Sequence, residues 1–376
     1  MYRGGHFSCY NVGMELLGCK KKRRLRVLIP LALVSALVLA LGEIPALAEY
    51  FFARGVTRFL SGCLNLITNY IPFSFYELTA VLLIVGGVAL AVGLVFLLCK
   101  RQWKRLSLWL YRLALAALCV LLAFGVLYAP LYCRGSVLPA LGLFDTEISR
   151  EKLYAAAEFY VERLNRTSEQ LERDEEGNVI PTSTFSELSA RINEEYGKLQ
   201  TDYFADFEVR AKEVALSVPM SYLGITGIYF PFYAESNVNV NIPPYELPVT
   251  LAHEIAHAKG VSQEGEANVA AYVLCIRADD AYLNYSGLMR AVASLLNSLP
   301  QEEYEVLYDS LSEEVKREYR NANAHYARYE GAIDAVSSFF NDIFLKANGV
   351  AGGTRSYSQT AASLVSLYEQ LAFSEQ

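Results

Sequence analysis

The sequence has little charge and few residues that could build a metal or disulfide framework. Charged side chains make up 19% of the 376 residues, and only 4 residues are histidine. The 7 cysteines are scattered without paired spacing, so neither a thiolate zinc site nor a disulfide scaffold is indicated. A bridge between Cys133 and Cys275 is conceivable, but unpaired apolar cysteines are the simpler expectation.

A nucleic-acid signature, an internal repeat and a low-complexity tract are also lacking. The formal net charge is −7. One dense basic block, Lys20 to Arg26, runs directly into an apolar segment, which is typical of a membrane flank rather than of a nucleic-acid surface. Nucleic acid is therefore not an expected partner.

Apolar residues, by contrast, are abundant and concentrate in the first third of the chain. Hydrophobic residues make up 53% of the sequence, more than an ordinary soluble protein carries. A membrane-spanning helix needs about 20 mainly apolar residues, and the sequence predicts three such helices, at about 27–47, 78–98 and 109–131. A basic block and a small-residue site at Ala46 to Ala48 would also fit a secretory signal peptide in the first run.

The basic residues predict how the chain is oriented in the membrane. Lys20 to Arg26 and the short loop Lys100 to Arg105 are the two positive clusters beside membrane runs, and such clusters lie in the cytoplasm. We therefore expect a cytoplasmic basic N-terminus at 1–26, a membrane domain at 27–133 and an extracytoplasmic domain at 134–376.

The sequence after the three apolar segments predicts an α+β domain that is mainly helical and has a small sheet. The charged and apolar pattern from Thr146 predicts a long exposed helix, and Thr184 to Glu187 fits a capping box that opens a second helix, forming a hairpin with the first. Gly224 to Ile242 has strand character, and Pro231 inside it favours an edge strand. Helices are expected again near 247–259, 263–282, through 345, and from 357 to the end.

The most informative stretch is His-Glu-Ile-Ala-His at residues 253–257. Residues four apart lie on the same face of a helix, so His253 and His257 present two imidazoles to one point and can share a zinc ion. Glu254 lies one step around the helix, where its carboxylate can reach a metal-bound water as the general base. Two buried, hydrogen-bonded histidines would be the non-functional interpretation.

A catalytic zinc site needs a third protein ligand and one open position. Gly260 can end the first helix and Ser262 can cap the next, which brings Glu264 and Glu266 back toward the histidines. These two carboxylates point about 200° apart on a helix, so only one can bind. Glu264 is preferred, because Asn268 follows it one turn later and could orient a ligand.

The pair of motifs His-Glu-Ile-Ala-His and Glu-Gly-Glu-Ala-Asn resembles the Glu-zincin metallopeptidases. In those enzymes a second helix supplies a glutamate ligand, and Glu264 to Asn268 is similar to their Glu-x-x-Ala-Asp pattern, with Asn268 in place of Asp. The whole chain more closely resembles an uncharacterised bacterial family of three-helix, membrane-anchored proteins regarded as zinc-dependent peptidases. The resemblance implies a zincin-like domain and a multi-pass protein of the bacterial plasma membrane.

Other residues are candidates for supporting roles. Glu-zincin substrates commonly lie along an edge strand before the zinc helix, a place that the 224–241 run occupies in this sequence. Peptide hydrolysis also needs an oxyanion donor, for which Tyr357 and Arg355 come first and His325 follows. Tyr326 is a further residue of suitable type.

These observations favour a membrane-anchored zinc metallopeptidase that cleaves an extracytoplasmic protein or peptide. The alternative is a zinc-containing sensor or binding module without turnover, which would not need Glu254. An intramembrane protease is disfavoured, because the stretch between Pro248 and Gly260 is too short to span a bilayer. Oligomeric state and cleavage specificity do not follow from the sequence.

Overall fold

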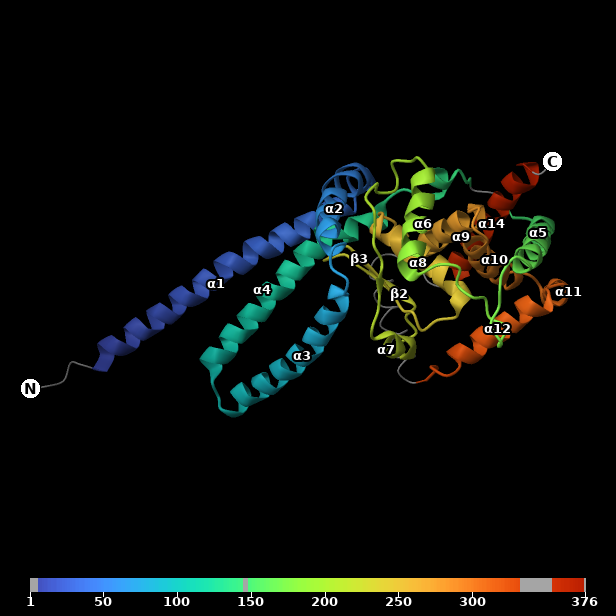
Figure 1. The fold of residues 1–376 in the computed structure, drawn as a ribbon. Coiled ribbons are helices and arrows are strands. Elements are labelled where there is room, and N and C mark those ends of the chain that lie inside the picture. The colour runs from blue at the N-terminus through green and yellow to red at the C-terminus, as the bar shows by residue number, and fades with distance from the viewer. Residues whose placement is uncertain (1–5, 145–147, 332–353, 375–376) are drawn as a thin grey trace, which may run out of the picture.

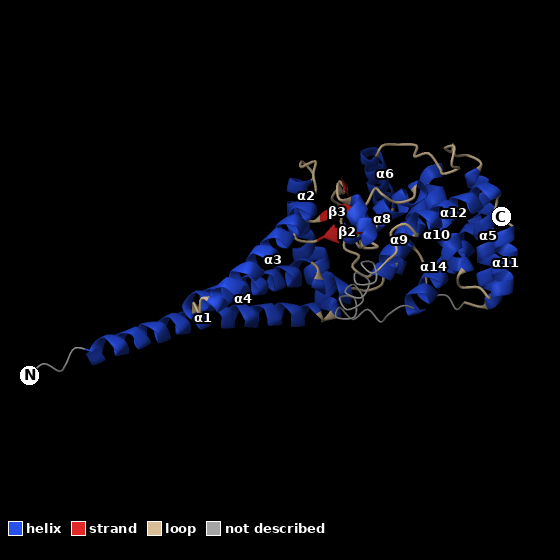
Figure 2. Cartoon of the chain, turned by 90° about the horizontal axis from the view of Figure 1, so that it is seen from below, coloured by secondary structure: helices blue, strands red, loops and turns tan. Residues whose placement is uncertain are grey.

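The computed structural model describes residues 6–144, 148–331 and 354–374, with side chains described from residue 23 onward except at 354–359 and 374. Figure 1 shows the described chain as an elongated bundle of helices joined to a broader helical domain, with the two termini at opposite ends. Figure 2 shows that helices dominate and that the few strands lie where the bundle meets the domain. The mainly helical architecture with a small sheet is therefore confirmed.

Three helices are long and apolar enough to cross a membrane. They are α1 (His6–Gly42), whose apolar part is Arg23–Gly42, α3 (Phe75–Cys99) and α4 (Trp103–Leu127). Most of their side chains are exposed, as lipid-facing helices require. Three spans were predicted, but the first ends at Gly42, because Pro45 follows, and the third ends at Leu127.

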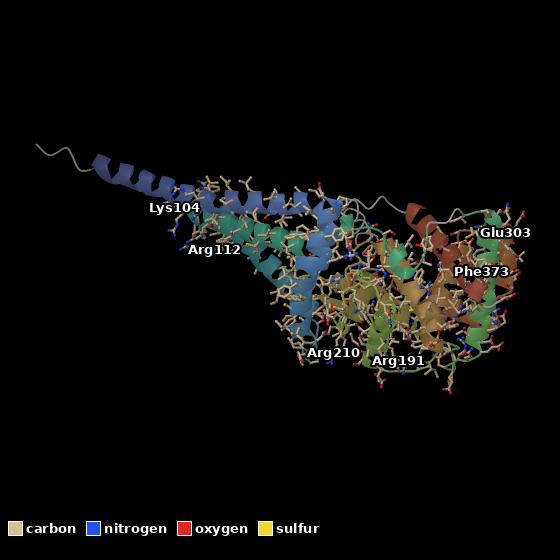
Figure 3. All side chains as sticks on the ribbon, turned by 90° about the horizontal axis from the view of Figure 1, so that it is seen from above. Lys104, Arg112, Arg191, Arg210, Glu303 and Phe373 are labelled. Carbon is tan, nitrogen blue, oxygen red and sulfur yellow. The ribbon has the colours of Figure 1, made fainter. Side chains whose placement is uncertain are left out.

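The two basic clusters lie at the same end of this bundle. Arg24 on α1 donates a 3.1 Å hydrogen bond to the Ser107 hydroxyl on α4, and its guanidinium lies 5.4 Å from the Tyr111 ring centre. Figure 3 shows Lys104 and Arg112 in the bundle, on the opposite side of the molecule from Phe373. Both clusters therefore lie at one end of the bundle, and the C-terminal domain lies at the other end.

Between α1 and α3 the chain forms two helices outside the apolar spans. A π-helix, η1 (Leu47–Val56), leads into α2 (Thr57–Thr68). After α4, the short 3-10 helices η2 (Ala129–Cys133) and η3 (Leu138–Leu141) lead the chain into the C-terminal domain, which comprises residue 134 onward.

The C-terminal domain is built around a buried helix, α10 (Ala281–Leu296). It packs against α5 (Arg150–Ser168), α8 (Leu247–Ala258) and α9 (Glu264–Arg277). The remaining described helices are α6 (Phe185–Lys198), α7 (Ser217–Tyr222), α11 (Gln301–Asp309), α12 (Glu313–Tyr326) and α14 (Thr354–Ser374), with the 3-10 helix η4 (Pro244–Glu246). Tyr282, Tyr285 and Leu288 of α10 are fully buried, because this helix is apolar on nearly every side.

Two predictions for the first helices of the domain were wrong. We expected an exposed helix, but α5 buries Ala156, Tyr160 and Leu164 completely. It packs on α10 and α14, whereas α6 packs on α8, so the two do not form a hairpin. The capping box at Thr184 and Glu187 is confirmed, with both reciprocal hydrogen bonds present.

The sheet has three short strands in the order β1-β3-β2. These are β1 (Lys212–Glu213), which runs parallel to β3 (Glu235–Val238), and β2 (Gly227–Phe230), which runs antiparallel to β3. The 224–242 run is thus a hairpin rather than one strand, and Pro231 begins its turn. β2 is an edge strand of this sheet as predicted, although the proline does not lie within it.

The sheet is tied directly to the start of a span. Ser74, the N-cap of α3, donates a 2.6 Å hydrogen bond to the Asn237 side chain on β3. The Glu235 carboxylate accepts from the amides of Phe75 and Tyr76 at 3.0 and 3.2 Å. The membrane bundle and the domain therefore share a polar joint at β3.

Candidate metal centre

The two histidines of the sequence motif lie on α8, a helix held deep in the domain. Pro248 occupies its first turn, where a missing amide hydrogen costs nothing, and Leu251, Ala252 and Ile255 are fully buried. The helix ends where Gly260 takes a left-handed conformation with φ of 104°. The chain then turns and enters α9 at Glu264.

This turn brings three ligand atoms together. His253 Nε2 lies 3.0 Å from His257 Nε2, and Glu264 Oε2 lies 3.2 and 3.6 Å from those two nitrogens. Among the residues the structure describes, these three form the group of side chains with metal-ligand spacing. The structure thus brings together the three residues predicted as ligands.

The spacing fits a tetrahedral zinc site. Ligands at about 2.0–2.1 Å from a zinc ion in tetrahedral geometry lie about 3.3–3.4 Å from one another. The three observed separations, 3.0, 3.2 and 3.6 Å, bracket that value. Two nitrogens and one carboxylate oxygen are also a donor set that zinc accepts in catalytic sites.

The ring of His257 is held in the orientation that a ligand needs. Its Nδ1 donates a 2.6 Å hydrogen bond to the Val261 carbonyl, so Nε2 is the nitrogen that faces the other two candidate ligands. The two imidazole planes stand at 87° to each other, so both Nε2 atoms can face one point. His253 Nδ1 is buried and has no hydrogen-bond partner among the described residues.

Glu264 and Glu266 have different partners, and only Glu264 faces the histidines. The Glu266 carboxylate turns away from the histidines and accepts a 3.2 Å hydrogen bond from the Val137 amide. Asn268 lines the same cavity as His253 and Glu264, but no hydrogen bond links it to either within the described residues. The prediction that Ser262 caps α9 was wrong, because the N-cap residue of α9 is Gln263.

The charges of the three groups favour a cation between them. Partial burial raises the pKa of the Glu264 carboxyl, but the two imidazoles hold that pKa well below its ordinary value. Burial lowers the pKa of His257, yet the Glu264 carboxylate outweighs it and raises that pKa to about 9. The Glu264 side chain remains 45% exposed, so the group can be reached from solvent.

Glu254 lies in the same cavity as the histidines and is almost completely buried. Burial raises the pKa of its carboxyl to about 7, and the two imidazoles moderate that increase. One carboxylate oxygen, Oε2, has no partner among the described residues. The other lies against Gly227 of β2, where an added Cβ would stand 2.4 Å from it. The strand thus leaves space for this carboxylate only because residue 227 is glycine.

Two cavities meet at the three-residue group. The larger, of about 510 Å³, is lined by His253, Glu254, His257 and Glu264, by Thr226 and the β2 residues Gly227 to Tyr229, and by Tyr128 and Tyr132. The smaller, of about 320 Å³, is lined by His253 and Glu264 together with Tyr272, Arg290 and Tyr326. The candidate centre is therefore open on two sides.

His325, one of the three predicted oxyanion donors, does not join this group. The Nε2 atom of His325 lies 3.0 Å from the Asn241 carbonyl, and His325 lines neither cavity. Arg355 and Tyr357 lie in the first turn of α14 rather than in a Gly-rich turn, and their side chains fall outside the described residues.

The structure adds residues that sequence reasoning did not select. Tyr128 lies beside His257, with its hydroxyl 3.5 Å from Nδ1, and Tyr229 packs against Tyr128. Arg290 and Tyr272 come from α10 and α9. No spacing rule links these positions to the histidines, because they reach the cavity from different elements. Tyr326, which the sequence indicates only as a residue of suitable type, lines the smaller cavity.

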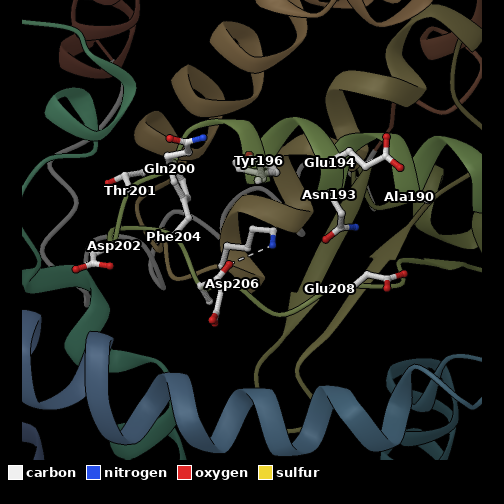
Figure 4. A pocket seen from close by; sticks show the side chains of 13 residues that line it. Ala190, Asn193, Glu194, Tyr196, Gln200, Thr201, Asp202, Phe204, Asp206 and Glu208 are labelled. Carbon is white, nitrogen blue, oxygen red and sulfur yellow. Dashed lines mark hydrogen bonds between the residues drawn. The ribbon is translucent and has the colours of Figure 1, made fainter.

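Another cavity, also of about 510 Å³, lies away from the candidate ligands, between α6 and the loop at residues 200–208. Figure 4 shows Glu194, Asp202, Asp206 and Glu208 around it. Burial lowers the pKa of Lys259 in its wall to about 8. The Lys259 amine donates to the carbonyls of Ala205 and Phe207 at 3.1 and 2.9 Å, so it fastens the loop to the end of α8.

These features define a mainly helical protein with three candidate membrane spans and a candidate metal centre beside a small sheet. The chain belongs to the DUF3810 family, described as a protein family of unknown function, whose family model matches residues 52–365. The match includes α2 to α4, the hairpin and all three candidate ligands. No curated protein and no solved structure matches the chain.

Proposed function

We propose that this protein is a membrane-anchored zinc metallopeptidase that hydrolyses peptide bonds of an extracytoplasmic protein or peptide. The observation that carries the proposal is the convergence of His253 Nε2, His257 Nε2 and Glu264 Oε2, with separations of 3.0 to 3.6 Å. When bound, the zinc ion would polarise the scissile carbonyl and lower the pKa of a water molecule.

Glu254 supports hydrolysis rather than metal storage alone. Its carboxylate lines the cavity of the two histidines but is not one of the three candidate ligands. A carboxylate at this position can accept a proton from the attacking water and return it to the leaving amine. A purely structural zinc site would have no use for a buried carboxylate with an unpaired oxygen.

The edge strand supports a polypeptide substrate. β2 lines the larger cavity beside the histidines and has only one neighbour, β3, in the described sheet. An extended peptide can pair with the backbone of such an edge, and the cavity beside it receives the scissile bond. The substrate would thus lie across the candidate ligands as an added strand.

Donors for the developing oxyanion are available from the smaller cavity. Tyr272, Arg290 and Tyr326 line it beside His253 and Glu264. The Tyr326 hydroxyl already donates its single hydrogen to Glu246, at 2.5 Å, so it supports that carboxylate rather than an oxyanion. The Glu246 carboxylate also lies 3.7 Å from Arg290 and holds this donor in place before a substrate arrives, as electrostatic stabilisation requires.

The position in the membrane completes the proposal. Both basic clusters lie at the end of the bundle away from the domain, and the positive-inside rule assigns such clusters to the cytoplasm. The C-terminal domain would then face the outside of the plasma membrane. Its substrates would be extracytoplasmic proteins or peptides.

Exchange of Glu254 for glutamine tests hydrolysis separately from metal binding. The intact protein in detergent would be incubated with a peptide library, and cleavage products would be identified by mass spectrometry. We expect Glu254→Gln to retain zinc. Its cleavage rate should fall by about 100-fold or more, the usual contribution of a general base. Glu302→Gln, an exposed change on α11, is the matched control and should cleave as the wild type does.

The same experiment distinguishes a sensor or binding module without turnover. Such a module would bind zinc and peptides equally well with or without the Glu254 carboxylate. Cleavage at equal rates by wild type and Glu254→Gln, or zinc binding with no cleavage by either protein, would contradict the proposed peptidase.

A further inference from the structure

The helix α2 has its polar and apolar faces reversed relative to an ordinary helix of a soluble domain. Thr57, Ser61, Asn65 and Thr68 are all buried, and they recur at the spacing of one helical face. Phe59, Cys63 and Leu66 recur at the same spacing on the other face and are exposed. A helix in water would bury the second set instead.

The polar face of α2 is fastened to the loops that support the sheet. Asn65 donates to the Ala234 carbonyl at 3.2 Å, and Thr68 donates to the Tyr233 carbonyl at 3.3 Å. Both carbonyls belong to the turn that joins β2 to β3. Asn69, just after the helix, donates to the Glu208 carbonyl and accepts from the Arg210 amide. The helix is therefore held firmly against the C-terminal domain by hydrogen bonds.

The apolar face is large and carries aromatic side chains. Phe59, Leu66 and Tyr70 are 69%, 64% and 81% exposed. Tyr50 and Phe51 in the preceding π-helix are also exposed. Such a continuous apolar surface on a protein exposed to water would be unfavourable unless something covers it.

The position of α2 indicates what covers this face. The helix lies between the spans α1 and α3 in sequence, and its Thr57 hydroxyl donates a 2.6 Å hydrogen bond to the Val126 carbonyl near the end of α4. Figures 1 and 3 show α2 lying across the ends of the bundle, between the spans and the domain. α2 therefore lies at the end of the spans that meets the domain, with its apolar face on the side opposite the polar residues that bond to the hairpin.

We propose that α2 is an interfacial helix, with its apolar face in the lipid bilayer and its polar face bonded to the C-terminal domain. Aromatic residues are favoured at this depth, because their rings lie among the headgroups and acyl chain ends. The guanidinium of Arg210, which is exposed beside this helix and lies 3.5 Å from the Glu208 carboxylate, keeps N–H groups that can meet lipid phosphates. The occupant of the apolar face is therefore lipid.

The consequence concerns the height of the β2-β3 hairpin above the membrane. Because α2 holds the hairpin turn at two carbonyls, the edge strand beside the candidate ligands is fixed close to the lipid surface. If the proposed peptidase function is correct, the site would act on polypeptide segments next to the membrane. The interfacial position of α2 does not depend on that function.

Tryptophan fluorescence in vesicles tests the placement of α2. The chain contains 2 tryptophans, Trp103 and Trp109, which would be replaced by phenylalanine. Phe59→Trp and Tyr70→Trp would then be reconstituted separately, as full chains, in vesicles of phosphatidylcholine and phosphatidylglycerol. We expect lipids brominated near the headgroup to quench both probes several-fold more than lipids brominated at the chain ends.

Phe373→Trp is the matched control, because Phe373 is exposed at the far end of the domain. Acrylamide in water should quench this control strongly, and brominated lipids should leave it unchanged. Acrylamide quenching of the Phe59→Trp and Tyr70→Trp probes as strong as that of the control would overturn the proposal, because the face would lie in water. Protection of these probes from both quenchers would also overturn it, because protein would then cover the face. Two probe positions guard against a single variant that fails to fold.

Discussion

The Glu254 carboxylate has its position because the neighbouring strand has no side chain at one residue. Gly227 lies so close that a Cβ would stand 2.4 Å from Oε1 and 2.7 Å from Cδ. The contact involves the strand that we propose pairs with substrate and the residue that we propose moves the proton. The space for the Glu254 carboxylate therefore depends on how closely β2 approaches α8 at Gly227.

Gly227→Ala should displace the Glu254 carboxylate without removing a candidate ligand. A shift of about 1 Å in a reacting group costs on the order of 100-fold in rate, so we expect a loss of that size in peptide cleavage. Zinc content, measured by mass spectrometry, should stay at the wild-type level. Gly197→Ala on α6 is the control, because no described heavy atom lies within 4 Å of its added Cβ, and it should change neither quantity.

At the residue scale, the motif on α8 could be predicted in full, whereas the third ligand could not be settled. Helical spacing alone brings His253 and His257 together. The choice between Glu264 and Glu266 depends on where the α8–α9 turn places α9. In the structure the Val137 amide donates a hydrogen bond to Glu266, which faces away from the histidines. The sequence favoured Glu264 because Asn268 could orient a ligand from the same helix face. The described residues show no hydrogen bond from Asn268 to a candidate ligand.

At the scale of elements, the turn between α8 and α9 controls the spacing of the three ligand atoms. Gly260 has φ of 104°, which a residue with a Cβ rarely adopts. An added Cβ would also lie 2.8 Å from Arg134 Nη1, which donates a 2.7 Å hydrogen bond to the Gly260 carbonyl. The backbone angle and the arginine together fix where α9 starts.

We therefore expect Gly260→Ala to destabilise the folded protein by about 1–3 kcal/mol, the usual cost of a strained backbone. It should also weaken zinc binding, because Glu264 would shift relative to the histidines. Thermal unfolding in detergent and a zinc titration measure the two effects. Gly135→Ala, where no described atom lies within 4 Å of the new Cβ, should leave both near wild type. An unchanged melting temperature for Gly260→Ala would contradict this interpretation of the turn.

The joint between the sheet and α3 provides a second test on this scale. Ser74 both caps α3, by accepting from the Glu77 amide at 3.0 Å, and holds Asn237 on β3. Ser149 caps α5 by accepting from the Lys152 amide, and its other hydrogen bond, to Glu151, stays within the same helix. Loss of a cap costs about 0.5–2 kcal/mol. Ser74→Ala should cost about 0.5–1.5 kcal/mol more than Ser149→Ala, because it also removes a hydrogen bond to the sheet. Equal melting temperatures would show that the joint contributes nothing.

Elements with a strong local pattern were predictable, and those set by tertiary packing were not. The three apolar spans, the capping box at Thr184 and the helix that carries the histidines follow from short-range patterns. β1 has only two residues and forms because it pairs with β3, so the local sequence pattern does not predict it. α5 looked exposed because charged residues are mixed among its apolar ones, although Leu153, Tyr160 and Leu164 lie on one buried face.

At the scale of the whole molecule, the arrangement of charges sets the predicted orientation. Arg24 and Ser107 are hydrogen-bonded, so the N-terminal basic block and the loop before α4 share one end of the bundle. The candidate ligands lie beyond the other end, in the C-terminal domain. One topology then satisfies the positive-inside rule for both clusters.

Reporter fusions in a bacterial host measure this orientation. Alkaline phosphatase, which is active only outside the cytoplasm, should be active when fused after residue 134 and inactive when fused after residue 101. A fluorescent protein that folds only in the cytoplasm should give the opposite pattern at the same positions. Phosphatase activity at the loop position would mean that the C-terminal domain faces the cytoplasm, contrary to our expectation.

The metal content of the intact, detergent-purified protein tests the central claim most directly. After exposure to zinc and removal of excess, the wild type should hold a single zinc ion per chain. His253→Ala, His257→Ala and Glu264→Gln should each lose it, whereas His325→Gln and Glu266→Gln should keep it, because those two side chains point elsewhere. A wild type that binds no metal, or ligand variants that bind as much zinc as the two controls, would contradict the metal centre and every function built on it.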